Sequence, residues 1–222
     1  MATTAMDATK LKLLEAAGEE FAEKGFEGAK VRSICSRAGV NNAAVNYHFG
    51  DKEQLYVRAV LEAHRCGTEL LPDEVFGQGT PADQLRCYVY HFLSNVLSLS
   101  RENSWHHALI LREMIRPTSA SETLVREAIR PRFDRLMGIL RRICPGAEER
   151  RLHALSFSVI GQCLHYRMAG AVSVRLVGAE AYERLDLDFL TDHITSFSLA
   201  ALGLTPPLDE AGESAGGEVL SR

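Results

Sequence analysis

The chain has no apolar run long enough to span a bilayer and no hydrophobic signal core near its N-terminus, so the sequence predicts a cytoplasmic protein. Its five cysteines are widely spaced and include no C-x-x-C pair, which favours buried thiols in a reducing compartment. Familiar enzyme motifs are also missing: there is no nucleotide-binding glycine loop, no G-x-S-x-G elbow and no H-E-x-x-H pair. Missing motifs alone are weak evidence against an enzyme, so the choice between an enzyme and a binding protein depends on the motifs that are present.

Positive charge is also scarce overall, since the 222 residues carry a formal net charge of -4. That balance argues against a protein that binds nucleic acid through its whole surface. The local balance is different between residues 28 and 52, where Lys30, Arg32, Arg37 and Lys52 face the single carboxylate of Asp51. The acidity therefore lies elsewhere, and this short segment is the candidate for a nucleic-acid contact.

No segment reads as a strand and no internal repeat is present, so the sequence predicts an all-α protein. Apolar residues recur at helical spacing, and glycine, proline and capping residues mark the ends. The helices expected from these signals cover residues 7–24, 31–38, 41–49, 51–70, 82–99, 104–116, 119–143 with a break at Pro131, 147–176 and 187–202. The break in composition from Pro72 to Pro81 predicts a domain boundary.

The segment from Val31 to Lys52 has the pattern of a helix-turn-helix. Val31 and Ile34 share one face of a first short helix, and Gly39 suits the tight turn after it. Asn41 is a good N-cap for a second short helix, in which Val45 and Phe49 face inward. That phase turns the remaining side chains of the second helix outward, where they can reach a DNA major groove.

The residue types suit contacts with DNA. Small and amide side chains near the start of the second helix allow close approach and base reading, while Tyr47 and His48 can donate to phosphates. The residues we predict to contact DNA are Lys30, Arg32, Asn42, Ala43, Ala44, Asn46, Tyr47, His48 and Lys52.

The run G-F-x-x-x-x-V-R-x-I-x-x-x-A-G-V-x-x-x-x-V-N-Y-H-F-G-D-K-E-x-L, which begins at Gly25, resembles the DNA-binding domain of TetR-type transcriptional repressors. The resemblance is dense from Leu11 to Leu61 and departs from the family at Ala29 and Lys30, where the family usually has Thr or Ser. Lys30 can still meet a phosphate but cannot cap a helix. The strings L-R-E-M-I-R-P-T from Leu111 and G-Q-C-L-H-Y-R from Gly161 resemble a TetR subclass with a CerR-type C-terminal domain.

The resemblance implies an N-terminal three-helix DNA-binding domain followed by a larger helical domain that binds an effector and dimerises. We assign residues 7–71 to the first domain and 82–204 to the second, and we expect the Gly- and Glu-rich residues 205–222 to be disordered. The expected helix over 147–176 is apolar on most of its circumference, so it must be covered by more than one neighbour. With the helix over 187–202 it can form a four-helix dimer interface.

Several polar and aromatic side chains lie on otherwise core-forming helices of the second domain. Convergent polar groups in an apolar cavity are typical of a small-molecule site. The ligand-binding residues predicted on this basis are Tyr88, His91, Trp105, His106, Arg112, Gln162, His165 and Tyr166. Single histidines of this kind more often satisfy a buried backbone group, and only the clustering of the set favours a pocket.

Two other modes of control remain open. The adjacent pair His106-His107 diverges on a helix and cannot chelate a metal as an i, i+4 pair would, so a metal site needs a third histidine from elsewhere. A redox switch would depend on a cysteine such as Cys163. An architectural DNA binder is disfavoured by the large acidic second domain.

The sequence therefore predicts a non-enzymatic, cofactor-free regulator: a homodimer, most simply a repressor, that binds a near-palindromic operator and is released by a small molecule. A metal- or redox-responsive repressor is the alternative.

Overall fold

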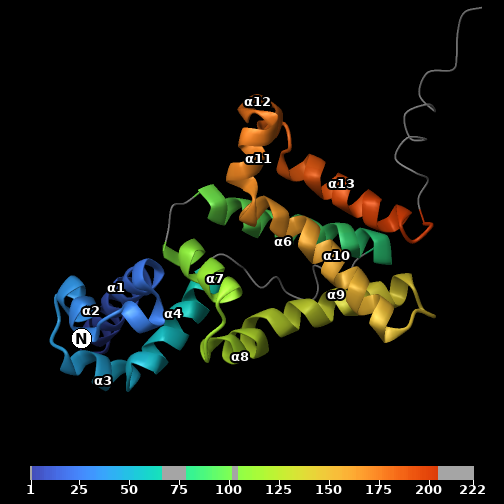
Figure 1. The fold of residues 1–222 in the computed structure, drawn as a ribbon. Coiled ribbons are helices and arrows are strands. Elements are labelled where there is room, and N and C mark those ends of the chain that lie inside the picture. Colours follow the sequence, from blue (N-terminus) through green and yellow to red (C-terminus); the bar gives the residue numbers. More distant parts are fainter. Residues whose placement is uncertain (1, 67–78, 102–104, 205–222) are drawn as a thin grey trace, which may run out of the picture. The chain divides into compact units, whose positions relative to one another are not determined.

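The computed structural model describes residues 2–66, 79–101 and 105–204, and every element in this part of the chain is a helix (Figure 1). The expected linker around residues 72–81 lies largely outside the described residues, and the expected cap at Ser104 and the tail over 205–222 lie wholly outside them. None of the described helices combines the length and apolar character that crossing a membrane requires. The all-α fold predicted from the sequence is confirmed.

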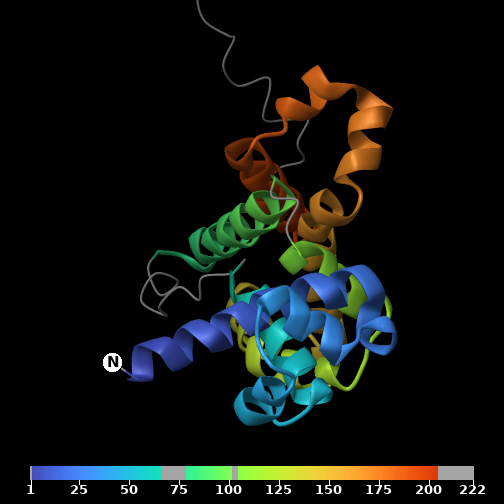
Figure 2. The same cartoon turned by 90° about the vertical axis from the view of Figure 1, so that its left-hand side faces the viewer.

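The chain divides into two compact units, one made of residues 1–70 and 98–134 and the other of residues 71–97 and 135–222. The first unit contains α1 (Ala2–Gly28), α2 (Val31–Ala38), α3 (Ala43–Phe49), α4 (Lys52–Cys66), α7 (Trp105–Ile115), α8 (Ala120–Leu124) and the π-helical turn η1 (Val125–Ile129). Within it α1 packs against α2, α4 and α7, and α4 packs against α7 and α8 (Figure 2). The sequence assigned α7 and α8 to the range 82–204, whereas they pack on the N-terminal helices.

The core of the first unit forms where α1 meets the helix-turn-helix. Leu13, Ala17 and Phe21, four residues apart, are fully buried on one face of α1. Leu11 is 63% exposed, because the buried stripe runs through Leu13 instead. Helix α1 is interrupted at Gly25, whose φ of 73° and ψ of 175° are outside the helical region, as its assignment as a stop predicted.

The helix-turn-helix forms at the predicted positions. Helix α2 ends at Gly39 in the left-handed conformation (φ 67°), and no atom lies within 4 Å of where a Cβ would stand, so this backbone angle is what requires glycine. Asn41 was predicted as the N-cap of the next helix, but the N-cap of α3 is Asn42, whose side chain makes no capping hydrogen bond; Asn41 accepts the backbone N–H of Ala43, two residues on, at 3.1 Å. Helix α4 does have a side-chain cap, since Asp51 accepts the backbone N–H of Gln54 at 2.8 Å.

The second unit contains most of α6 (Pro81–Arg101) and of α9 (Arg130–Ile143), together with α10 (Glu149–Met168), α11 (Gly170–Val177), α12 (Ala179–Glu183) and α13 (Leu187–Ala200). Helix α10 lies against α13 and α11 (Figure 1). The buried side chains of the unit include Leu85, Val89, Leu93, Leu136, Leu140, Leu152, Val159, Leu190 and Ile194. Helix α13 begins at the N-cap Asp186, whose carboxylate accepts the N–H of Phe189 at 2.9 Å.

Two helices differ from the expectation. The single helix expected over 147–176 breaks at Ala169 (φ -114°, ψ 3°), and a short helix, α12, follows that the sequence signals did not predict. The break coincides with a close contact, because a Cβ at Gly170 would stand 3.0 Å from the Tyr182 hydroxyl of α12. The break expected at Pro131 does not interrupt the chain of helices: α8, the π-helical turn η1 and α9 follow one another without a gap, and Val125 and Arg130 keep helical backbone angles. Pro131 falls in the first turn of α9, where its missing N–H is tolerated.

Candidate nucleic-acid interface and ligand region

Helix α3 presents an outward face with no apolar core contact. Val45 is fully buried and Phe49 is 9% exposed, which anchors one side of the helix in the core of the first unit. Asn46 and Tyr47 lie on the opposite side, and Tyr47 is 73% exposed. An aromatic side chain held that far into solvent adds little to the stability of the fold through burial.

The structure places the nine predicted DNA-binding residues at or near the surface. Six are exposed: Lys30, Arg32, Asn42, Ala43, Asn46 and Tyr47. Three are half-buried: Ala44, His48 and Lys52. The His48 ring meets the Tyr47 ring edge-on, with 5.0 Å between ring centroids, so the two side chains support each other's orientation.

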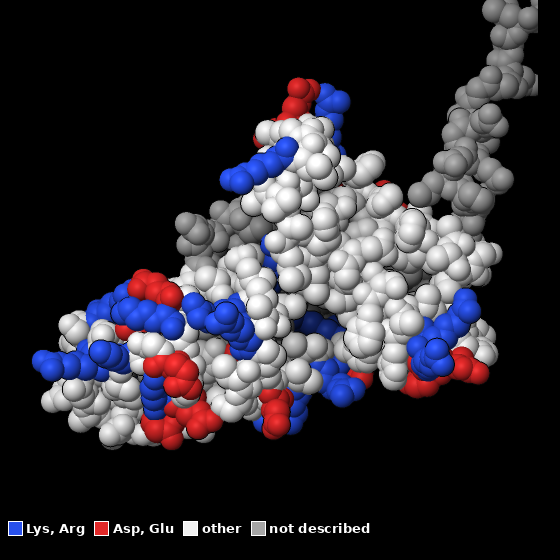
Figure 3. All heavy atoms as spheres, viewed as in Figure 1, with Lys and Arg blue, Asp and Glu red and all other residues white. Residues whose placement is uncertain are grey.

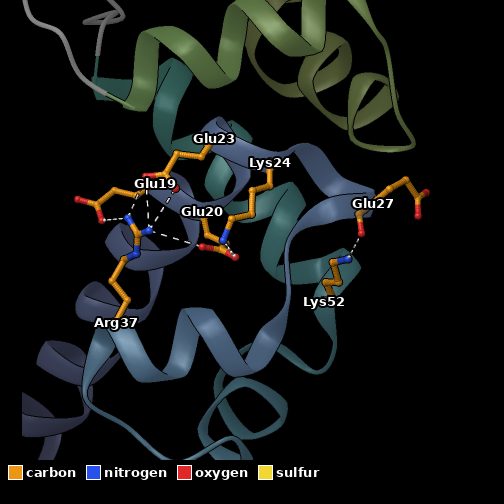
Figure 4. A network of polar contacts seen from close by, with 7 residues as sticks. All are labelled: Glu19, Glu20, Glu23, Lys24, Glu27, Arg37 and Lys52. Atoms are coloured by element: carbon orange, nitrogen blue, oxygen red, sulfur yellow. Dashed lines mark hydrogen bonds and ion pairs between the residues drawn. The ribbon is translucent and has the colours of Figure 1, made fainter.

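Arg37 is held in a cluster of glutamates on α1 (Figure 4). Its guanidinium lies 2.7 Å from the Glu19 carboxylate, 3.3 Å from Glu23 and 3.5 Å from Glu20. These hydrogen bonds to Glu19 and Glu23 raise the pKa of Arg37. The cluster ties α2 to α1, and it also commits one of the four cationic side chains counted in the motif to a partner within the protein.

Glu20, the innermost glutamate of that cluster, is only 1% exposed and meets Lys24 at 2.7 Å. Lys24 lowers the pKa of this carboxyl most, and the backbone amide of Lys30 and the charge of Arg37 lower it further, against the opposing effect of burial. The contact with the Lys30 amide is informative, because Lys30 occupies the N-cap position of α2 and its side chain makes no capping hydrogen bond. A carboxylate from α1 therefore supports the start of α2 where the resembled family has Thr or Ser.

Lys52 is also engaged within the first unit. Its ammonium lies 3.5 Å from the Glu27 carbonyl oxygen (Figure 4). It also lies 4.7 Å from the centroid of the Phe26 ring. Figure 3 shows that acidic and basic side chains are interspersed over the α1–α4 region rather than forming a purely basic face. The surface that α3 presents thus combines a few cations with amide, aromatic and small side chains.

A buried carboxylate joins α4 to α7 and α8. Glu113 is 2% exposed and accepts hydrogen bonds from the Tyr56 hydroxyl at 2.7 Å and from the Thr118 amide at 2.8 Å. The hydroxyls of Thr118 and Ser121 also donate to it. Because Tyr56 belongs to α4 and the other donors lie at or before the start of α8, this network fixes α7 and α8 to the helix that follows the helix-turn-helix.

Three of the eight predicted ligand-binding residues lie in the first unit, and α1 engages two of them. The Trp105 indole donates to Glu15 at 2.8 Å, and a Cβ at Gly18 would stand 2.2 Å from its ring. His106 stacks on that ring at 3.7 Å between centroids. Arg112 donates to the Glu23 carbonyl at 3.3 Å. These contacts pack α7 on α1.

The other five lie in the second unit. Tyr88 is buried at 5% exposure, and burial lowers the pKa of His91 and raises that of Tyr166. Gln162 donates to the Ser158 carbonyl at 3.4 Å, and His165 lies 3.1 Å from the Ser173 hydroxyl. The predicted set is therefore divided between the two compact units.

The residues needed for metal or redox sensing show their own environments. Within the described ranges, no three His, Cys, Asp or Glu side chains gather closely enough to hold a metal ion. Cys163 is fully buried, and burial raises the pKa of its thiol to about 12. The thiolate is the reactive species, so Cys163 in this position is unreactive near neutral pH.

Comparison with known proteins gives matches in both halves of the chain. Residues 13–59 match the profile of the bacterial regulatory proteins of the tetR family, and residues 81–202 match that of the C-terminal domain of the HTH-type transcriptional dual regulator CecR. The dual regulator CecR of Shigella flexneri is 26% identical over 196 residues, which cover 84% of this chain and 87% of CecR. The HTH-type transcriptional repressor AcnR of Corynebacterium efficiens is 41% identical over 54 residues, or 24% of this chain and 29% of AcnR.

Solved structures show the same fold at low identity. The hemolysin II transcriptional regulator HlyIIR superposes with a TM-score of 0.59 at 22% identity, covering 86% of this chain and 98% of that one. FadR from Bacillus subtilis, solved in complex with stearoyl-CoA, superposes with a TM-score of 0.62 at 15% identity over 86% of this chain and 98% of that one.

Proposed function

Because this chain belongs to the TetR family of bacterial transcriptional regulators, we propose that it acts as a homodimeric repressor that binds a near-palindromic operator and is released by a small molecule. The observation that carries the DNA-binding part is the outward face of α3, where Tyr47 is 73% exposed while Val45 and Phe49 hold the helix in the core. A helix anchored in this way can enter a major groove without disturbing its own unit.

The proposed dimer rests on apolar side chains of α10 and α13 that are at least half exposed in the described part of the chain. Phe157 is 62% exposed, and Phe189 and Phe197 are 52% and 50% exposed. On α13 the His193 ring lies between these two phenylalanines, parallel to Phe189 at 6.2 Å and tilted against Phe197 at 6.3 Å. The hydrophobic effect favours burying these side chains against a second copy of the chain. An isologous interface formed by α10 and α13 of both copies would bury them.

Release by an effector requires only that the ligand binds one arrangement of the dimer better than another. The buried Glu113 network supports this coupling, since it makes α7 and α8 part of the unit that carries α3. A displacement of α8 or of the η1 turn would therefore carry the DNA-reading unit with it. The redox alternative is disfavoured by the buried, unreactive thiol of Cys163.

The DNA-binding part is tested with the purified full chain and a DNA site selected from random sequence. Tyr47→Ala should reduce affinity for the selected site by about 10-fold or more, because one exposed side chain lost from a groove contact costs roughly 1–3 kcal/mol. Its thermal stability should stay within about 0.5 kcal/mol of the wild type, as expected for an exposed position. Arg150→Ala, at an exposed position on α10 in the second unit, is the matched control and should leave affinity unchanged.

Two results would contradict the proposal. If no sequence is enriched from random DNA, the chain is not a sequence-specific DNA-binding protein. If Tyr47→Ala binds the selected site as tightly as the wild type while retaining its fold, α3 does not read the DNA.

A further inference from the structure

Helix α10 carries an arginine just beyond the end of its buried stripe. Leu152, Ser156, Val159 and Cys163 follow one another at spacings of three or four and are all buried. The next positions near this stripe, three and four residues beyond Cys163, are Tyr166 and Arg167. The Arg167 side chain is half-buried, but its Nε and one terminal nitrogen, Nη2, are shielded from solvent.

Within the part of the chain that the structure describes, those two buried nitrogens have no hydrogen-bond partner. Burial lowers the pKa of Arg167, and no carboxylate offsets the effect. Several carboxylates of the second unit are already engaged: Asp83 with Thr80, Glu149 with Arg141, Glu180 with Arg184, Asp186 with the Phe189 amide and Asp192 with Arg86. Glu148, Glu183 and Asp188 are exposed. A buried cation without a partner is unusual, because buried charges are normally paired.

The two unsatisfied nitrogens also have a defined geometry. Nε–H and Nη2–H point in parallel from one edge of the planar guanidinium, and this edge matches the two oxygens of a carboxylate. Arg112, the other arginine on a helix with predicted ligand residues, has a partner in the Glu23 carbonyl. The structure thus distinguishes the two arginines, and Arg167 is the one with its donor edge vacant.

We propose that Arg167 binds the carboxylate of an amphipathic monocarboxylic acid, and that this acid is the effector class of the protein. The assignment rests on the ligand-responsive regulator proposed above and specifies its ligand. One guanidinium balances the single charge of a carboxylate, whereas a phosphate dianion would leave excess charge in a poorly solvated place. The neighbouring Cys163 thiol is neutral, and the apolar side chains of Met168 and Val172, which follow Arg167 in the sequence, are exposed, which suits an apolar body on the acid.

The test compares the full-length wild type with Arg167→Met, Arg167→Lys and the exposed control Arg151→Gln on the same helix. The probes are decanoate, benzoate and indole-3-acetate, each beside its primary amide, with inorganic phosphate as the anion control. Calorimetric titration should show at least one of these acids binding to the wild type and its amide not binding. Arg167→Met should weaken that binding by about 10-fold or more, Arg167→Lys by less, and Arg151→Gln by under about 2-fold, as loss of a charge-assisted pair predicts.

A second readout separates a ligand contact from a structural role. Without ligand, Arg167→Met should have the same or a higher melting temperature, because the substitution removes an unpaired buried charge. A lower melting temperature, or conversion of a dimer to monomers, would mean that Arg167 already has a partner in the fold or in the second copy, and would overturn the assignment.

Three ligand results would also overturn it: no acid in the panel binds, acid and amide bind equally, or phosphate binds more tightly than every acid. Binding to the DNA site selected from random sequence is measured in the same variants. If that binding is retained while no acid binds, only the effector assignment fails. If neither the wild type nor any variant binds DNA specifically, the proposed function itself fails, whatever the titration shows.

Discussion

Replacing Tyr56 with phenylalanine isolates one hydrogen bond of the buried Glu113 network. Tyr56 is 1% exposed, and its ring packs edge-on against Phe21 at 4.8 Å and against Phe26 at 5.1 Å. Phenylalanine keeps those ring contacts and removes only the hydroxyl that donates to Glu113 at 2.7 Å. The change in the free energy of unfolding therefore reports the hydrogen bond and little else.

The expected loss is about 1.5–3 kcal/mol, the usual contribution of a hydrogen bond to a charged group. The upper half of that range is the more reasonable, because Glu113 is only 2% exposed and water cannot easily replace the lost donor. The donors that remain, the Thr118 amide and the Thr118 and Ser121 hydroxyls, keep the carboxylate partly satisfied, so the loss should not exceed this range.

The assay is urea denaturation followed by tryptophan fluorescence. The chain has a single tryptophan, Trp105, which packs on α1 in the first unit, so the signal follows the unit that contains the network. Tyr47→Phe is the matched control, since it removes a tyrosine hydroxyl from a side chain that is 73% exposed. The control should change the unfolding free energy by less than about 0.5 kcal/mol.

Two outcomes would refute the reasoning. One is a Tyr56→Phe protein whose stability lies within about 0.5 kcal/mol of the wild type, which would mean that the hydroxyl contributes no buried bond. The other comes from a double-mutant cycle with Glu113→Ala, which removes the acceptor: if the Tyr56→Phe effect is the same in both backgrounds, the two side chains are not coupled.

Three further predictions follow from packing and burial. Gly18→Ala should destabilise the protein by about 1–3 kcal/mol in thermal melts and shift the tryptophan emission, because the new Cβ would stand 2.2 Å from the indole. The control is Gly138→Ala in α9, where the nearest atom to the new Cβ is 3.8 Å away; it should be neutral or stabilising in the same melts. Phe197→Glu should yield a monomer in sedimentation at micromolar concentration, whereas the control Leu11→Glu should leave the dimer intact. A dimer that survives Phe197→Glu would place the interface elsewhere. Burial raises the pKa of the Cys163 thiol to about 12 from an ordinary 9.0, so this thiol should resist iodoacetamide at pH 8 in the native protein but not in urea, and rapid labelling of the native protein would contradict the burial. The unfolding free energy should fall as pH rises from about 9 toward 12, because the Cys163 thiol ionises there only in the unfolded chain.

The elements that the sequence predicted well depend on local signals. The turn at Gly39 and the inward phase of Val45 and Phe49 both involve residues a few positions apart. Short-range spacing and capping chemistry determine such features, so a single sequence contains the information for them.

The features that the sequence did not predict depend on contacts between distant positions. The glutamates around Arg37 come from another helix, 14 to 18 residues away for its hydrogen-bond partners, and no pattern in either helix marks the pairing. The hydrogen bond between Tyr56 and Glu113 joins positions 57 residues apart. The break at Ala169 coincides with a contact to Tyr182, so the uninterrupted apolar pattern across it was misleading.

The glutamate cluster around Arg37 has a consequence for how ionic strength affects the protein. Each phosphate that a DNA-binding protein neutralises releases a condensed counterion, and the logarithm of the affinity falls with the logarithm of the salt concentration by about 0.9 per phosphate. With Arg37 bound by three glutamates and Lys52 held by Glu27 and Phe26, the exposed Lys30 and Arg32 remain of the four cations in the motif. A dimer would then show a slope of about -4, where four cations per subunit would give about -7. Occupancy of the operator would vary comparatively little during osmotic stress, so that changes in transcription would report the effector more than the salt content of the cell.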